Sequence, residues 1–197
     1  MVLLNHQTKY FVRGNVEMPC RSCLKVVVVG NTLSGKSSVI ACMMNKPSRN
    51  EVTIGCELHT MEVMSPSGCE TSLLIWDLPG SERFKILTVT YARSAAIVMI
   101  VVDATNGVAE IDAQYSDWKE LLASTSPTYR YMIINKIDQL DDDAMQLLRD
   151  RFPCAYFTSS FTGAGLDEVC KDLQSTAMQL HRCNLAVCHS EKKNTCF

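Results

Sequence analysis

A glycine-rich segment that ends in a lysine and a serine is the first place where residue types and spacing indicate chemistry. The segment Gly30–Ser37 reads G-N-T-L-S-G-K-S and directly follows the apolar run Val26–Val29. A loop that wraps a polyphosphate must turn consecutive backbone N–H groups inward, which small residues permit, and a following helix adds its positive end. Because the pattern G-x-x-x-x-G-K-[ST] stands here between a predicted strand and a predicted helix, we expect it to bind a nucleoside triphosphate.

Two side chains of this segment have specific expected roles. Lys36 supplies a cation to the β- and γ-phosphates, and the Ser37 hydroxyl is a hard oxygen ligand for Mg²⁺. A glycine turn with an incidental lysine is the alternative, which the strand–loop–helix setting disfavours. The other residues of the segment that we expect to bind nucleotide are Gly30, Asn31, Thr32, Leu33, Ser34, Gly35 and Ser38.

The base is indicated by the sequence Asn135-Lys136-Ile137-Asp138, which follows the strand-like run Tyr131–Ile134. Guanine presents two neighbouring donors, N1–H and N2–H₂, and a single carboxylate accepts from both. Adenine would leave the Asp138 carboxylate unpaired, and unpaired buried polar groups discriminate by about 10⁴-fold. Asn135 is expected to tie neighbouring loops together and contact the ring, while the Lys136 stem lies along the purine face. The sequence therefore predicts GTP and GDP as ligands.

Three more residues are spaced to sense the third phosphate. Asp77 ends a predicted strand and can hold Mg²⁺ through water. Gly80 can offer its backbone N–H to the γ-phosphate. Thr53 stands sixteen residues after Ser37, and its hydroxyl can complete the Mg²⁺ shell when a triphosphate is bound, although a plain solvated threonine is the alternative. We expect the two loops to order with GTP and loosen with GDP.

The elements that must position these residues follow from alternating apolar runs and amphipathic stretches. Strands are predicted at 25–29, 57–64, 71–76, 96–103, 131–135 and 155–158. Helices are predicted at 37–45, 82–94, 112–123, 142–151 and 166–183. The second and third strands flank a turn and form a hairpin. The alternation predicts an α/β P-loop NTPase fold, with a six-stranded, mostly parallel sheet, helices on both faces and one antiparallel edge.

Length and composition fit a single globular domain with short ends. The chain has 197 residues, of which 47% are apolar and 20% charged, and its formal net charge is −2. Disorder and a nucleic-acid partner are therefore not expected. No apolar run reaches the roughly 18–20 residues that span a bilayer, and early polar residues argue against a secretory signal. We expect an N-terminal extension at 1–23, a nucleotide-binding domain at 24–183 and a tail at 184–197.

The ten cysteines are scattered through predicted strands and helices. A chain that buries its own core does not need disulfide bonds for stability. The scattered cysteines therefore predict a reducing, cytoplasmic compartment. Cys20 and Cys23 form a C-x-x-C pair. A zinc site needs a second pair of ligands, which the sequence does not offer, so a chance pair is the favoured interpretation.

In this order and spacing, the motifs resemble the Ras superfamily of small GTPases, and residues 53–105 are closest to its Rab branch. Rab proteins carry W-D-T-A-G-Q-E-R-F, and Trp76–Phe84 reads W-D-L-P-G-S-E-R-F. Leu87–Arg93 reads L-T-V-T-Y-A-R, similar to the L-T-x-x-Y-Y-R of Rab proteins. The fifth family motif, E-T-S-A-K, corresponds to Phe157–Phe161. The resemblance covers residues 24–183 and implies a GTP-binding switch that uses Mg²⁺.

One departure concerns the mechanism. Ser81 stands where the family has the glutamine that orients the attacking water. A serine hydroxyl is too short to reach that water, so we hypothesise slow intrinsic hydrolysis, with Ser81, Gly80 and Lys36 as the residues of the catalytic site. A partner that supplies the missing group in trans is the alternative.

Another departure concerns the base. Phe161 replaces a lysine that packs near the base in the family, and an aromatic ring can still stack there. Ser159 and Ser160 can still offer backbone N–H groups to the guanine oxygen. None of these differences removes nucleotide binding on physical grounds.

Three functions stay open from the sequence. The first is a hydrolysing switch, the second a GTP-locked, hydrolysis-deficient Rab-like binding module, and the third an ATP-using P-loop enzyme, which Asn135 and Asp138 disfavour. The resemblance implies effector proteins, an exchange factor and a GTPase-activating protein as partners, together with a role in vesicle traffic in the cytoplasm or on the cytosolic face of endomembranes.

The tail holds separated cysteines and does not end in a C-a-a-X box. Membrane association through a lipid on Cys196, membrane contact through a partner, and a soluble linker all stay open.

Overall fold

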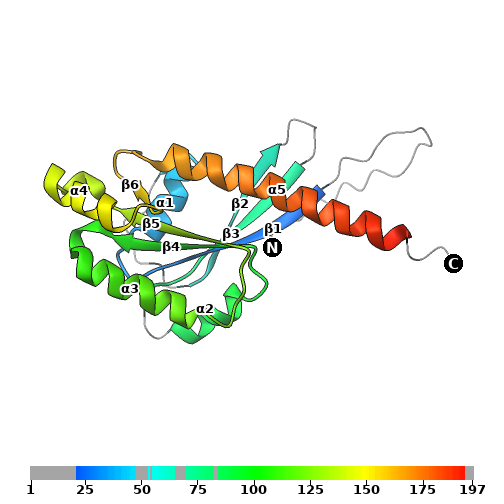
Figure 1. The fold of residues 1–197 in the computed structure, drawn as a ribbon, viewed down its shortest axis with the longest axis horizontal. Coiled ribbons are helices and arrows are strands. Elements are labelled where there is room, and N and C mark those ends of the chain that lie inside the picture. The colour runs from blue at the N-terminus through cyan, green and yellow to red at the C-terminus, as the bar shows by residue number, and fades with distance from the viewer. Residues whose placement is uncertain (1–20, 48–52, 54, 65–69, 82–83, 194–197) are drawn as a thin grey trace, which may run out of the picture.

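The computed structural model describes residues 21–47, 53, 55–64, 70–81 and 84–193. It contains a six-stranded sheet in the order β2-β3-β1-β4-β5-β6, with helices on both sides (Figure 1). The strands are β1 (Arg21–Val29), β2 (Glu57–Met64), β3 (Glu70–Asp77), β4 (Ile97–Asp103), β5 (Tyr129–Asn135) and β6 (Tyr156–Thr158). All neighbouring pairs are parallel except β2 and β3, which are antiparallel. The predicted sheet and its antiparallel edge are therefore confirmed.

The helices are α1 (Lys36–Met43), α2 (Lys85–Ala92), α3 (Val108–Leu121), α4 (Asp142–Arg151) and α5 (Leu166–Lys193). Helix α4 has the predicted bounds, and an Asp141 side chain that accepts from the Ala144 N–H marks its start. Among the described helices, none combines the length and the apolar character that a membrane span requires.

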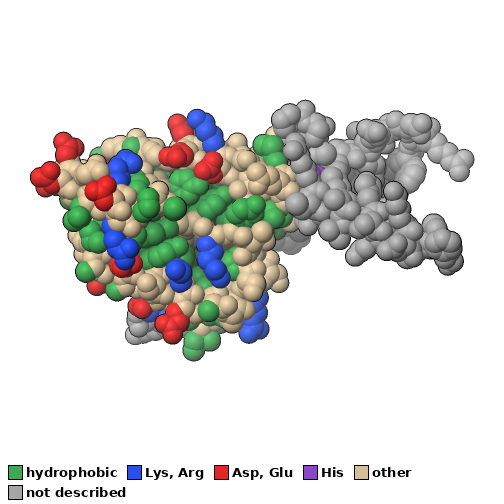
Figure 2. All heavy atoms as spheres, in the orientation of Figure 1, with side chains coloured by type: hydrophobic (Ala, Val, Ile, Leu, Met, Phe, Trp, Pro, Cys, Tyr) green, Lys and Arg blue, Asp and Glu red, His purple; other side chains and the backbone are tan. Residues whose placement is uncertain are grey.

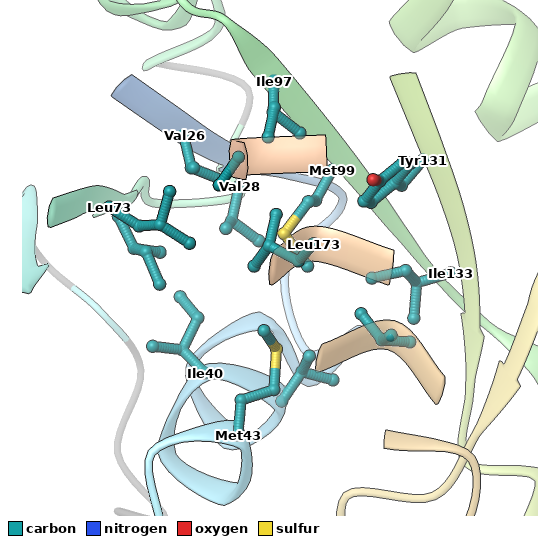
Figure 3. Packing of buried hydrophobic residues seen from close by; sticks show 14 of the residues in the cluster. Val26, Val28, Ile40, Met43, Leu73, Ile97, Met99, Tyr131, Ile133 and Leu173 are labelled. Atoms are coloured by element: carbon teal, nitrogen blue, oxygen red, sulfur yellow. The ribbon is translucent and has the colours of Figure 1, made fainter. Parts of the chain in front are cut away.

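Two hydrophobic clusters hold the helices against the sheet. One joins α1 and α5 to the face of the sheet drawn in Figure 3, where Ile40, Met43 and Leu173 pack on strand residues. The other joins α2, α3 and α4 to the opposite face. Strand β4 contributes to both clusters, and its first six residues are all buried, as a continuous apolar run in the middle of a sheet requires.

Several predicted bounds were wrong. Strand β1 begins at Arg21, which pairs with Glu70, so the sheet includes three residues assigned to the N-terminal extension. Helix α3 begins at Val108, earlier than predicted, directly after Gly107. Helix α5 continues to Lys193 instead of ending at Cys183. Residues 1–20 of the extension, the turn of the hairpin, Glu82, Arg83 and Cys196 lie outside the described residues.

The parallel strands bring their carboxyl ends to one edge of the sheet. The segments that follow β1, β4, β5 and β6 start from that edge, and Asp77 at the end of β3 pairs with Val28 near the end of β1. In sheets of this kind, ligands bind outside the carboxyl ends of the strands. The residues that the sequence singled out therefore meet there.

Gly165 tests the loop that precedes α5. Its φ is +73°, and an added Cβ would lie 2.1 Å from the Phe157 carbonyl oxygen. We expect Gly165→Ala to lower the free energy of unfolding by about 3 kcal/mol, since backbone strain and a backbone clash add. Urea denaturation measures the change.

Gly163 offers a matched control in the same loop. Its φ is +85°, but nothing lies within 4 Å of an added Cβ. Gly163→Ala should cost only the backbone strain, about 1 kcal/mol. Equal losses in the two variants would contradict the clash.

Candidate nucleotide-binding site

A cleft of about 580 Å³ opens at the carboxyl edge of the sheet. Most of the predicted binding residues line it, although they come from segments more than 100 residues apart. The lining residues are Thr32, Leu33, Gly35, Lys36, Ser37, Ser38, Thr53, Gly80, Lys136, Asp138, Gln139, Ser160 and Phe161.

Lys36 is the buried cation of the cleft. Its side chain is only 6% exposed, and its ammonium group donates to the Asn31 carbonyl oxygen at 2.8 Å. Burial lowers the pKa of Lys36 to about 8, although the nearby Asp77 carboxylate opposes this shift. A buried ammonium with a single carbonyl partner has donors left for phosphate oxygens.

Three oxygen side chains meet beside Lys36. The Ser37 hydroxyl donates to one Asp77 carboxylate oxygen at 2.5 Å and lies 2.8 Å from the Thr53 hydroxyl. The other Asp77 oxygen, Oδ1, is buried and has no hydrogen-bond partner. Burial raises the pKa of Asp77 above its ordinary value, although Ser37 and Lys36 oppose the shift. Hard oxygen donors around a partly unpaired carboxylate fit Mg²⁺, which prefers such ligands together with phosphate oxygens.

Gly80 lies directly against the glycine-rich loop Gly30–Ser37, which is predicted to bind phosphate and is here called the phosphate-binding loop. An added Cβ would lie 2.6 Å from the Gly30 carbonyl oxygen, the Asn31 carbonyl carbon and the Lys36 ammonium. A side chain therefore has no room at this position. Ser81, the next residue, does not line the cleft; its carbonyl oxygen accepts from the Phe84 N–H.

Asn135 connects the two ends of the cleft. It is fully buried, and its amide donates to the Ser34 carbonyl oxygen at 3.1 Å and to the Ser160 hydroxyl at 3.3 Å. Its side-chain oxygen accepts from the Ser160 N–H and from the Thr158 hydroxyl. One side chain thus joins the phosphate-binding loop to the loop after β6, as predicted.

One hydrogen bond and one ion pair fix the polar side chains at the end of the cleft where the base is predicted to bind. The Ser159 hydroxyl donates to Asp138, which leaves the second carboxylate oxygen available. The Lys136 ammonium pairs with Asp103, the residue that ends β4. Burial alone would raise the pKa of Asp103, but hydrogen bonds from Lys136 and Thr105 outweigh it and hold the pKa below its ordinary value.

Two large apolar side chains remain exposed at the mouth of the cleft. Phe161 is 89% exposed and Leu33 is 72% exposed. Leu33 also has a φ of +66°, a conformation that costs a non-glycine residue free energy. Both side chains are free to be covered by a ligand.

Some predicted residues support the cleft instead of lining it. These are Gly30, Asn31, Ser34, Asp77, Asn135 and Ser159. The sequence did not single out three other residues that the structure brings to the site: Gln139 in the lining, Asp103 behind Lys136, and Trp118, whose indole N–H donates to the Asn31 side chain. For Asp103 a signal existed, because it ends a buried strand as Asn135 does.

Comparison with known proteins identifies the family. Residues 25–138 match the family described as Roc, Ras of Complex, Roc, domain of DAPkinase. Ras-related protein RABG3e of Arabidopsis thaliana is 30% identical over 177 residues, which cover 81% of this chain and 84% of that protein. Ras-related protein Rab7 of Drosophila melanogaster is 29% identical, with 81% and 83% covered. A probable Rab-related GTPase of Acanthamoeba polyphaga mimivirus is 30% identical, with 70% and 68% covered. The chain therefore belongs to the Ras superfamily of small GTPases, as a divergent member of its Rab branch.

Proposed function

We propose that this chain is a guanine-nucleotide switch that binds GTP and GDP with Mg²⁺ and hydrolyses GTP slowly. The observation that carries the proposal is the junction of three segments beside Lys36. Ser37 and Thr53 lie within 2.8 Å of each other, Asp77 accepts from Ser37, and Gly80 contacts the phosphate-binding loop. A metal and a third phosphate at this junction would hold both loops, and their loss would release them.

Magnesium would be held by the Ser37 and Thr53 hydroxyls directly and by Asp77 through water. When bound, it neutralises charge on the phosphates. The chain's own contribution is position: Lys36 is fixed by Asn31, and Gly80 lines the same cleft beside Lys36. The backbone N–H groups of the phosphate-binding loop complete the phosphate end.

Guanine selection rests on Asp138. The Ser159 hydroxyl orients its carboxylate, and the remaining oxygen can accept from the base. The methylene stem of Lys136, held at its tip by Asp103, offers one apolar wall. Phe161 in the same lining offers an aromatic surface for the base.

Slow hydrolysis is supported by the position of Ser81. Gly80 lines the cleft, whereas Ser81 does not, which supports the hypothesis that the short serine side chain does not reach the place of an attacking water. The second candidate function, a GTP-locked Rab-like binding module, is favoured by the same observation and differs only in the rate. An ATP-using enzyme is disfavoured by Asp138.

The cellular role follows from the family. We propose a role in vesicle traffic in the cytoplasm or on the cytosolic face of endomembranes, with effectors, an exchange factor and a GTPase-activating protein as partners. On the face drawn in Figure 2, basic and acidic side chains are interspersed, which fits protein partners better than nucleic acid.

Asp138→Asn tests base selection. The amide presents a donor where guanine also has donors, so we expect GTP affinity to fall by at least about 100-fold, with little change for ATP. Xanthosine triphosphate, which has a carbonyl in place of the guanine amino group, should then bind better than GTP. Competition against a fluorescent nucleotide measures all three.

Asp141→Asn is the matched control, because Asp141 caps α4 outside the cleft. It should leave all three affinities within about twofold, since an amide oxygen still caps the helix. Unchanged GTP preference in Asp138→Asn would contradict the assignment.

Ser81→Gln tests the hydrolysis hypothesis. A carboxamide can orient a water, so we expect the single-turnover rate of GTP hydrolysis to rise by about 10-fold or more. Ser81→Ala should leave the rate unchanged. A rate in the unaltered chain that is ordinary for a small GTPase would refute slow hydrolysis, and equal rates in the unaltered chain and in Ser81→Gln would refute the role given to the serine.

A further inference from the structure

The indole of Trp118 contacts the phosphate-binding loop without lining the cleft. Trp118 belongs to the buried stripe of α3, with Ile111 and Gln114, and is only 2% exposed. Its Nε1–H donates to the Asn31 side-chain oxygen at 2.9 Å. A residue 87 positions away in the sequence thus fixes the side chain of the second residue of the loop.

The backbone of Asn31 contacts Lys36 and lies next to Gly80, two residues that are proposed to bind phosphate. Its carbonyl oxygen accepts from the Lys36 ammonium at 2.8 Å, and its carbonyl carbon lies 2.6 Å from where a Gly80 Cβ would stand. The orientation of this one peptide therefore sets where the ammonium of Lys36 points and what surface Gly80 meets. Trp118 holds the side chain of the same residue, which limits how the peptide can turn.

Helix α2 contacts the same ring. The Lys85 ammonium lies 6.0 Å from the Trp118 ring centroid, at the outer limit of a cation–π contact. Lys85 begins α2, the helix that follows the Gly80 segment. The ring therefore touches α2 on its face and the phosphate-binding loop through its N–H.

We infer that Trp118 is a positioning residue for phosphate binding: its indole N–H holds Asn31, and Asn31 holds Lys36. This inference rests on the proposed function, because it assumes that Lys36 binds phosphate. Trp118 does not line the cleft that contains Asp138, so its effect is on the phosphates of GTP and GDP alike and leaves the choice of base unchanged.

Trp118→Phe tests the inference, because it removes the N–H and keeps most of the packing. We expect GDP and GTP to bind about fivefold more weakly, which corresponds to about 1 kcal/mol, while the ratio of GTP to ATP affinity stays constant. Asn31→Ala should weaken binding as well, and the double variant should bind no more weakly than Asn31→Ala alone. Isothermal titration with Mg²⁺ present measures the cycle.

Trp76→Phe is the matched control, since Trp76 packs on Tyr91 and Lys25 instead of Asn31. We expect Trp76→Phe to leave the nucleotide affinities unchanged. The chain has two tryptophans, so this variant keeps Trp118 alone, and the fluorescence emission of Trp118 should change when GDP is added. Additive losses in Trp118→Phe and Asn31→Ala, or an unchanged affinity in Trp118→Phe, would overturn the inference. Failure of the proposed function is separate, because the unaltered chain would then show no preference for GTP over ATP.

Discussion

The buried amide of Asn135 is the contact on which the cleft depends. Parallel strands bring the phosphate-binding loop and the loop after β6 to the same edge of the sheet, but they do not join them. Asn135 does so, with donors to Ser34 and Ser160 and an acceptor for the Ser160 N–H. A buried amide with all these partners stabilises one arrangement, because any other leaves polar groups unpaired. One buried side chain therefore joins the end of the cleft that is proposed to bind phosphate to the end that is proposed to bind the base.

The sequence predicted the sheet and its helices because their signals are local. Strand β4 is a continuous apolar run, and α4 has both an acidic cap and helical periodicity, so both were placed well. The ends that were missed depend on distant partners. Arg21 belongs to β1 because Glu70 lies opposite, and helix α5 continues past the predicted domain end without a local stop signal. The Ras superfamily and its Rab branch, which the motifs indicated, are confirmed by the family match and the relatives.

The candidate site likewise contains some residues that the sequence predicted and others that only the structure reveals. Residues in sequence motifs, such as Lys36 and Asp138, were predicted because phosphate and guanine chemistry demand those side chains at that spacing. Asp103 and Trp118 act on motif residues through contacts that only the folded chain creates. No periodicity or composition distinguishes a buried core tryptophan from one whose N–H reaches a loop. The binding roles of the motif residues themselves remain predictions.

The exposed Leu33 and Phe161 side chains have a consequence for the colloidal behaviour of the protein. Leu33 and Phe161 are 72% and 89% exposed. Without a ligand, the protein therefore presents apolar surface at the opening of the cleft, and a second protein molecule can associate there. A ligand in the cleft would lie against both residues, because both line it. If guanine nucleotide binds as proposed, its presence in the storage buffer would raise the solubility of the protein. Its removal would favour aggregation of the folded protein under conditions in which the domain does not unfold.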